Sequence, residues 1–139
     1  MVGISLSTTP QRPSYYVIEV VQPVSEGVHM RVARPHVWRP PTDVYETEDS
    51  VIVRVEIAGM RDADFSIVLD GRYLSIRGMR PDIQERRAYH QMEIPFGEFQ
   101  TEVELASPVQ AQGIDAVYTN GFLRITLPRA FPQKIQVEE

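Results

Sequence analysis

The chain has 139 residues, of which 42% are hydrophobic and 24% are charged, so it is long enough for one domain with a buried core. Its net charge of −5 argues against a nucleic-acid or anionic-membrane partner, and its lack of cysteine excludes disulfides, thiolate metal sites and cysteine nucleophiles. No apolar run approaches the roughly 18 residues that span a bilayer, and no secretory leader is recognisable. We therefore expect a cytoplasmic protein without a membrane span.

Residues 1–39 are expected to form an N-terminal arm and a linker. The small, polar, proline-punctuated residues 1–13 are typical of disorder. Residues 15–21, YYVIEVV, have the aromatic and β-branched composition of a strand, and residues 28–32 could form a weaker one. Two interpretations stay open for these strands: an extra sheet element packed on the domain, or an adhesive arm for assembly or client binding. Prolines around Trp38 mark the linker into the main domain.

Residues 40–129 carry a regular series of short alternating segments. Apolar side chains at every second position predict strands at 43–46, 50–57, 64–70, 72–77 and 99–105. Asp70-Gly71 has the composition of a hairpin turn, and Gly78 is expected to close the strand that follows it. Residues 79–87 are charged and contain a proline, which indicates an exposed loop, and residues 89–94 are expected to form a short strand on that loop.

The strongest local signal is Asn120-Gly121, which lies between two alternating runs within residues 116–129. Both residues tolerate the positive φ angles of a two-residue type I′ turn, so the segment predicts a β-hairpin. Pro128 is expected to end the second strand. Strands at this spacing, without a long helical pattern, predict an all-β fold: an antiparallel, immunoglobulin-like β-sandwich.

Residues capable of catalysis are sparse and do not form a recognisable pattern. The three histidines, His29, His36 and His90, are not at metal-ligand spacing from one another. The acidic pairs could be imagined as acid–base partners, but Glu102 and Glu104 fall on the polar face of a predicted strand. We therefore expect no enzymatic activity, no metal and no cofactor.

In its order of motifs, the chain resembles the small heat shock proteins, whose core is the α-crystallin domain. The matching motifs are Trp38-x-Pro40-x-x-Asp43-Val44, VIVRVEIAGM with Ala58-Gly59, Leu74-Ser75-Ile76-Arg77-Gly78-Met79-Arg80, Tyr89-His90, Phe96-Gly97-Glu98-Phe99, and the hairpin from Ala116 to Pro128. In residues 130–139, the C-terminal extension, Ile135-Gln136-Val137 is similar to the family's I-x-I/V motif. Two positions differ: Thr101 stands where the family usually has arginine, and Ala106-Ser107 where it has Leu-Pro.

The resemblance implies an ATP-independent holdase that binds partially unfolded client proteins and assembles with itself into dimers and larger oligomers. Ile135 and Val137 would dock in an apolar groove of a neighbouring subunit, because side chains two residues apart in an extended segment point the same way. The resemblance places the groove at Phe65, Ile67, Leu69 and Val117. It places Tyr89 and His90 at the dimer interface, on a loop exchanged between subunits.

Two other classes of function stay open. One is a co-chaperone module of the CS-domain type, which has a similar sandwich and is typically monomeric. The other is a purely structural assembly module. The subunit number, the clients and the trigger for activation do not follow from the sequence, nor does the order of residues 1–37.

Overall fold

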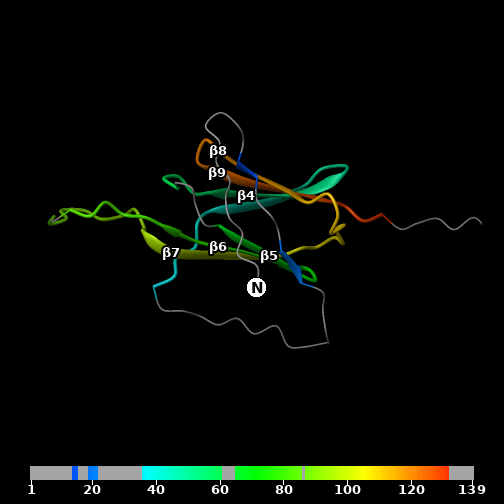
Figure 1. The fold of residues 1–139 in the computed structure, drawn as a ribbon, viewed down its shortest axis with the longest axis horizontal. Coiled ribbons are helices and arrows are strands. Elements are labelled where there is room, and N and C mark those ends of the chain that lie inside the picture. Colours follow the sequence, from blue (N-terminus) through cyan, green and yellow to red (C-terminus); the bar gives the residue numbers. More distant parts are fainter. Residues whose placement is uncertain (1–13, 16–18, 22–35, 61–64, 86, 132–139) are drawn as a thin grey trace, which may run out of the picture.

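The computed structural model describes residues 14–15, 19–21, 36–60, 65–85 and 87–131. Nine strands lie in these ranges and form two stacked sheets (Figure 1). The five-stranded sheet has the order β1-β8-β9-β4-β3, and the four-stranded sheet has the order β2-β5-β6-β7. The strands are β1 (Ser14–Tyr15), β2 (Glu19–Val21), β3 (Thr42–Glu46), β4 (Ser50–Glu56), β5 (Ser66–Asp70), β6 (Tyr73–Arg80), β7 (Gly97–Glu104), β8 (Asp115–Thr119) and β9 (Phe122–Pro128).

This architecture confirms the predicted all-β sandwich. All neighbouring strands are antiparallel except β2 and β5, which run parallel. Within the described ranges, no helix has the length and apolar character needed to cross a bilayer.

The hydrophobic core lies between the sheets, because apolar side chains at every second position turn inward. Strands β4 and β9 are in register, so that inward residues such as Val53 and Ile125 are direct neighbours. Both side chains are fully buried. The buried apolar set is Val51, Ile52, Val53, Val55, Ile57, Phe65, Ile67, Leu69, Leu74, Ile76, Phe99, Val103, Leu105, Ala116, Leu123, Ile125 and Leu127.

The hairpin between β8 and β9 forms as predicted. Asn120 has a φ of 52° and Gly121 a φ of 80°, the left-handed conformation that a type I′ turn requires. The Gly121 carbonyl accepts a hydrogen bond of 2.8 Å from the Ile57 backbone N–H. The turn is therefore fixed against the chain segment that follows β4.

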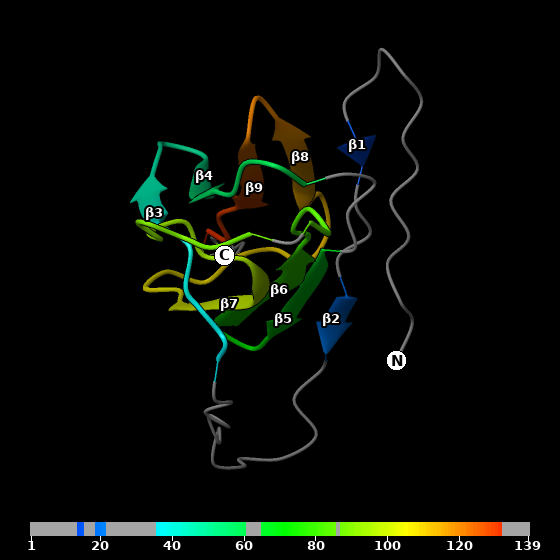
Figure 2. The ribbon, with the colours of Figure 1, turned by 90° about the vertical axis from the view of Figure 1, so that its left-hand side faces the viewer.

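The long edges of the sandwich are covered unequally. On one side, β1 pairs with β8 and β2 pairs with β5, so the arm covers both sheets (Figure 2). On the other side, the backbone of Trp38 runs beside β7: its N–H donates to Glu98 at 3.1 Å, and its carbonyl accepts from Gln100 at 2.9 Å. Strand β3 ends the five-stranded sheet, and no described strand pairs with its outer edge.

Three local predictions differ from the structure. The strand expected to close at Gly78 continues to Arg80, because β7 extends far enough to pair with it: Gly78 lies opposite Phe99, and Arg80 opposite Gly97. Residues 89–94 form no strand. They belong to a loop that extends away from the sandwich (Figure 1), where none of the described strands lies beside them to supply hydrogen bonds.

The N-terminal run also differs from the single strand expected over residues 15–21. Its described parts, β1 and β2, join two different sheets. This arrangement agrees with the interpretation of an extra sheet element packed on the domain. The disorder expected for residues 1–13 and the strand expected at 28–32 lie outside the described residues.

Candidate assembly interface

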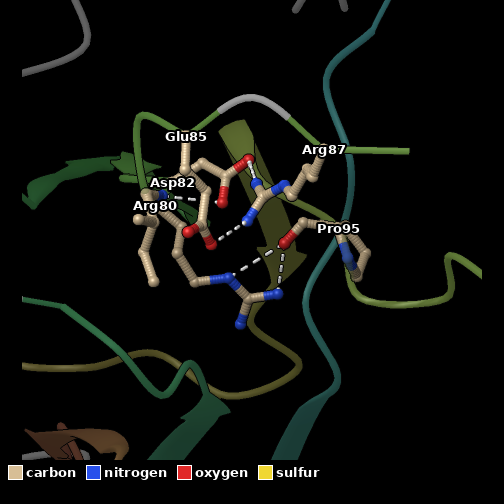
Figure 3. A network of polar contacts seen from close by, with 6 residues as sticks. Arg80, Asp82, Glu85, Arg87 and Pro95 are labelled. Carbon is tan, nitrogen blue, oxygen red and sulfur yellow. Dashed lines mark hydrogen bonds and ion pairs between the residues drawn. The ribbon is translucent and has the colours of Figure 1, made fainter. Parts of the chain in front are cut away.

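Arg80 holds the base of the loop formed by residues 81–96 against the sandwich; this segment is called the 81–96 loop below. Its Nε donates a 2.9 Å hydrogen bond to the Pro95 carbonyl, and its Nη2 donates to the same oxygen (Figure 3). Its Nη1 reaches the Ala58 carbonyl at 3.5 Å. The guanidinium also lies 4.4 Å from the centre of the Trp38 ring. A planar guanidinium can make all these contacts at once, so one side chain ties the loop to the body.

A second contact braces the first half of the loop. Arg87 donates to the carboxylate of Asp82 and contacts Glu85 at 3.5 Å (Figure 3). The other oxygen of Asp82 accepts a 2.8 Å hydrogen bond from the Ile83 backbone N–H. The hydrogen bond from Arg87 is the main cause that lowers the pKa of Asp82, and the same contact raises the pKa of Arg87. The Asp82 carboxylate is thus held in its charged form.

Beyond these contacts, the loop presents apolar side chains to solvent. The exposed fractions are 69% for Ile83, 48% for Tyr89, 61% for Met92 and 63% for Ile94. Four large apolar groups on one protruding loop are a concentration typical of an interaction surface. Tyr89 and His90, predicted at the dimer interface, are both exposed here, although no contact with a second subunit tests that role.

Strand β3 is the second candidate surface. Its burial is low throughout, with Val44 45% exposed and Tyr45 39% exposed. An edge strand with free backbone N–H and C=O groups can accept another strand. The β3 edge and the loop are therefore two candidate surfaces for contact with another copy.

The predicted groove residues lie at the opposite side of the sandwich. Phe65, Ile67 and Leu69 are at most 3% exposed, so in this chain they belong to the core. The Phe65 ring lies 5.4 Å from the ring of Tyr118, which links the two sheets at that side. Val117 is half-buried and pairs with Tyr15 of β1. A groove role for these four residues stays a prediction.

Thr101 stands at a position where small heat shock proteins usually have arginine. It is the buried polar residue of the described core, at 1% exposure. Its hydroxyl accepts a 2.9 Å hydrogen bond from the Thr42 hydroxyl and lies 3.3 Å from the Arg39 Nε donor. A cation from the linker therefore contacts this position. Ser107, at the second differing position, donates a 2.5 Å hydrogen bond to Glu46 of β3.

The remaining predicted site residues, Ile135 and Val137, lie outside the described residues. The described residues end at 131, and in Figure 1 this C-terminal part of the ribbon, drawn in red, lies at the end of the sandwich opposite the 81–96 loop. Its direction there is fixed by Ala130, whose N–H donates to the Pro108 carbonyl at 2.9 Å. In the part of the chain that the structure describes, His, Asp and Glu side chains form no group of three that could hold a metal.

Arg80 and Trp38 belong to the candidate site, although the sequence motifs that contain them indicated no such role. Both appeared within matched motifs, but their contact joins segments 42 positions apart and needs the three-dimensional structure to be seen. In the sequence, these two residues could have been noticed as an arginine directly after an alternating strand and a tryptophan flanked by prolines.

Comparison with known proteins agrees with the fold. The profile of the Hsp20/alpha crystallin family matches residues 43–139. Small heat shock protein C2 of Rickettsia felis is 33% identical over 65% of this chain and 60% of its own length. A probable 15 kDa heat shock protein of Leptospira interrogans is 30% identical over 76% of this chain and 81% of its own length.

A solved structure gives the same result. The crystal structure of a small heat-shock protein from Xylella fastidiosa, described as having a distinct high order structure, superposes with a TM-score of 0.60. It is 27% identical, over 73% of this chain and 98% of the other. The chain therefore belongs to the Hsp20/alpha crystallin family, a family of small heat shock proteins that act as non-enzymatic chaperones.

Proposed function

We propose that this protein is an ATP-independent holdase, which binds partially unfolded proteins and prevents their aggregation. The observation that carries the proposal is the 81–96 loop, which holds Ile83, Tyr89, Met92 and Ile94 exposed and away from the sandwich. Such a surface suits both self-association and the capture of apolar client segments. Membership of the small heat shock family supports the same activity.

The assembly unit is a dimer. The 81–96 loop of one copy would lie along the open edge of β3 in the other, where strand addition supplies the hydrogen bonds that residues 89–94 lack in the single chain. Tyr89 and His90 would then lie between the subunits. The two braces at Arg80 and Asp82 support this geometry, because they keep the loop extended before the partner arrives.

Larger oligomers form through the C-terminal extension. Ile135 and Val137 would dock between β5 and β8 of a neighbouring subunit, against the side where Phe65, Ile67, Leu69 and Val117 lie. Burying two such side chains contributes on the order of 3–5 kcal/mol before ordering costs, which is weak enough for subunits to exchange. The Xylella fastidiosa structure is described as having a distinct high order structure, which supports assembly beyond a dimer.

Client protection tests the holdase activity directly. Insulin is reduced so that its B chains aggregate, and light scattering is followed with and without an equimolar amount of the protein, in buffer free of nucleotide. We expect strong suppression of scattering. Aggregation that proceeds at the same rate as with an inert protein of similar size would contradict the proposal.

A further inference from the structure

The guanidinium of Arg39 is anchored at the side of the sandwich formed by β3 and β7. Its Nε lies 3.3 Å from the hydroxyl oxygen of Thr101, a residue that is 1% exposed. This oxygen lies 2.9 Å from the hydroxyl of Thr42. Thr42 begins β3 and Thr101 lies on β7, the two strands that Figure 2 shows at the side away from β1 and β2. One nitrogen of a linker side chain is therefore fixed between the edges of the two sheets.

The remainder of this guanidinium is available for an acidic partner. Arg39 is exposed, and within the described ranges its Nη1 and Nη2 groups form no ion pair. The arginine of the neighbouring strand, Arg54, is already 3.3 Å from the carboxylate of Asp43. The two Nη groups of an arginine match the two oxygens of a carboxylate. The β3 side of the sandwich thus has an oriented cation at which an acidic side chain can bind.

The 81–96 loop carries an acidic side chain of the required kind. Two of its carboxylates, those of Asp82 and Glu85, contact Arg87. Glu93 is exposed, and its carboxylate accepts a 2.6 Å hydrogen bond from the side-chain amide of Gln91. In the part of the chain that the structure describes, no cation forms an ion pair with Glu93. The β3 side and the loop therefore each present one charge without an ionic partner, and the two charges are opposite.

Within a single chain, these two groups do not meet. The loop extends away from the sandwich (Figure 1), whereas the Arg39 guanidinium is held against Thr101. Glu93 belongs to residues 89–94, the segment proposed above to lie along β3 of another copy. Since Arg39 stands beside the start of β3, that arrangement brings the Glu93 carboxylate of one copy to the Arg39 side of the other.

We propose that Arg39 of one copy binds Glu93 of the other, and that this reciprocal ion pair selects a second copy of this chain as the partner of the β3 edge. The inference rests on the dimer proposed above and adds the side chains that determine its specificity. Small heat shock proteins usually have arginine at position 101 itself, so in this chain the linker supplies the cation that stands there. An apolar segment that lacks an acid at the matching place gains no such pair.

Charge reversal at either position tests the pair. The parent is the full chain with Ile135→Ser and Val137→Ser, so that the dimer constant is measured without assembly through the tail. Arg39→Glu and Glu93→Arg each place two like-charge contacts in every dimer, because a two-fold interface repeats each contact. We expect either change to raise the dimer Kd about tenfold or more in sedimentation experiments at low salt.

Two matched controls reverse exposed charges elsewhere on the sandwich. Arg77→Glu changes β6, and Asp115→Arg changes the start of β8 at the other side. Both should leave the dimer Kd within about twofold of the parent. Glu93→Gln removes the pair without repulsion, and it should lessen the rise in Kd that added salt causes in the parent.

Mixing the two reversed chains shows whether the pair forms between copies. In a dimer of one Arg39→Glu chain and one Glu93→Arg chain, both contacts again join opposite charges. One chain carries an isotope label, and native mass spectrometry then counts like dimers and mixed dimers separately. We expect mixed dimers to exceed either like dimer about tenfold or more. Both changes in one chain should also restore the dimer.

The outcomes distinguish this inference from the proposed dimer. Single reversals that dimerise as tightly as the parent would overturn the ion pair and leave the dimer intact. Weakened single variants whose mixture forms no excess of mixed dimers would show that the two residues do not meet between copies, which also overturns the pair. A parent that stays monomeric would overturn the dimer and, with it, the pair. Circular dichroism and thermal unfolding confirm that every variant is folded.

Discussion

The guanidinium of Arg80 lies over the ring of Trp38, 4.4 Å from its centre. Trp38 belongs to the segment that leads into β3, and Arg80 is the last residue before the 81–96 loop. The contact therefore joins the two elements that we propose to form the dimer. The direction in which the loop leaves the sandwich therefore depends on the position of the segment that leads into β3.

Arg80→Lys should loosen the loop while leaving the sandwich folded. Lysine keeps the charge but cannot donate two hydrogen bonds to Pro95 while stacking on Trp38. We expect a loss of about 1–3 kcal/mol in dimer stability, from the charged hydrogen bonds and the cation–π contact. Analytical ultracentrifugation measures the dimer, and limited proteolysis reports the exposure of the loop.

Arg77→Lys is the matched control for that change. Arg77 lies on the same strand, three residues earlier, and its side chain is exposed. Its substitution should leave the dimer constant unchanged. Equal effects of the two lysine variants would show that the Arg80 contacts do not position the loop.

The Asp82–Arg87 contact makes the loop sensitive to acid. Because hydrogen bonding from Arg87 lowers the folded-state pKa of Asp82, this contact stabilises the loop above the ordinary aspartate pKa of about 3.9. The stabilisation is lost as the pH falls through the lowered folded-state value. The protection of backbone amides in residues 81–96 against hydrogen exchange, corrected for the intrinsic rate at each pH, should therefore fall in that acidic range. Asp82→Asn should remove this acid-dependent step, and a step of unchanged size in that variant would assign it to another group.

Gly121→Ala should destabilise the sandwich more than Gly71→Ala. Both glycines have positive φ angles, 80° and 61°, which cost an alanine roughly 1–2 kcal/mol. Only at Gly121 would the added Cβ come within 3.3 Å of the Ala58 Cβ, whereas nothing lies within 4 Å at Gly71. Overpacking adds about 1 kcal/mol to the cost at Gly121. Urea denaturation measures both, and equal losses would contradict the close approach of the turn to Ala58, in the segment that follows β4.

Thr101→Val tests the buried hydroxyl. Valine keeps the shape but removes the acceptor of the Arg39 Nε donor, whereas the Thr42 hydroxyl can still donate to the Pro40 carbonyl at 2.9 Å. We expect a loss of about 1 kcal/mol in the free energy of unfolding. The control is Thr126→Val on the outer side of β9, where the side chain is half-buried and the change should stay within about 0.5 kcal/mol. A Thr101 variant as stable as this control would mean that the hydroxyl contacts contribute nothing.

The elements predicted well are those determined by neighbouring residues. Asn120-Gly121 specifies its turn through the φ angles that only a few residue types adopt, and the alternation of β4 and β9 specifies their inward faces. Strand ends and pairing partners depend on distant segments. The strand expected at 89–94 is absent because no described strand lies beside those residues in the single chain, and β1 and β2 separate because each meets a different sheet edge.

The candidate site shows the same division. The exposed loop and the tail motif are visible in the sequence, whereas the contacts of Arg80 join residues 15 and 22 positions away and were not predicted. The pairing of β5, the strand that follows Phe65 and carries Ile67 and Leu69, with an arm strand was also not predicted. Their alternation specifies a face of the strand, but it does not specify what covers that face.

The mass of the assembly tests the central claim most directly. Native mass spectrometry compares the full chain with the variant that carries Ile135→Ser and Val137→Ser, at the same concentration and pH. We predict that the full chain forms species larger than a dimer and that the variant falls to the dimer. An oligomer of unchanged mass in the variant, or a strict monomer for the full chain, would contradict assembly through the loop and the tail.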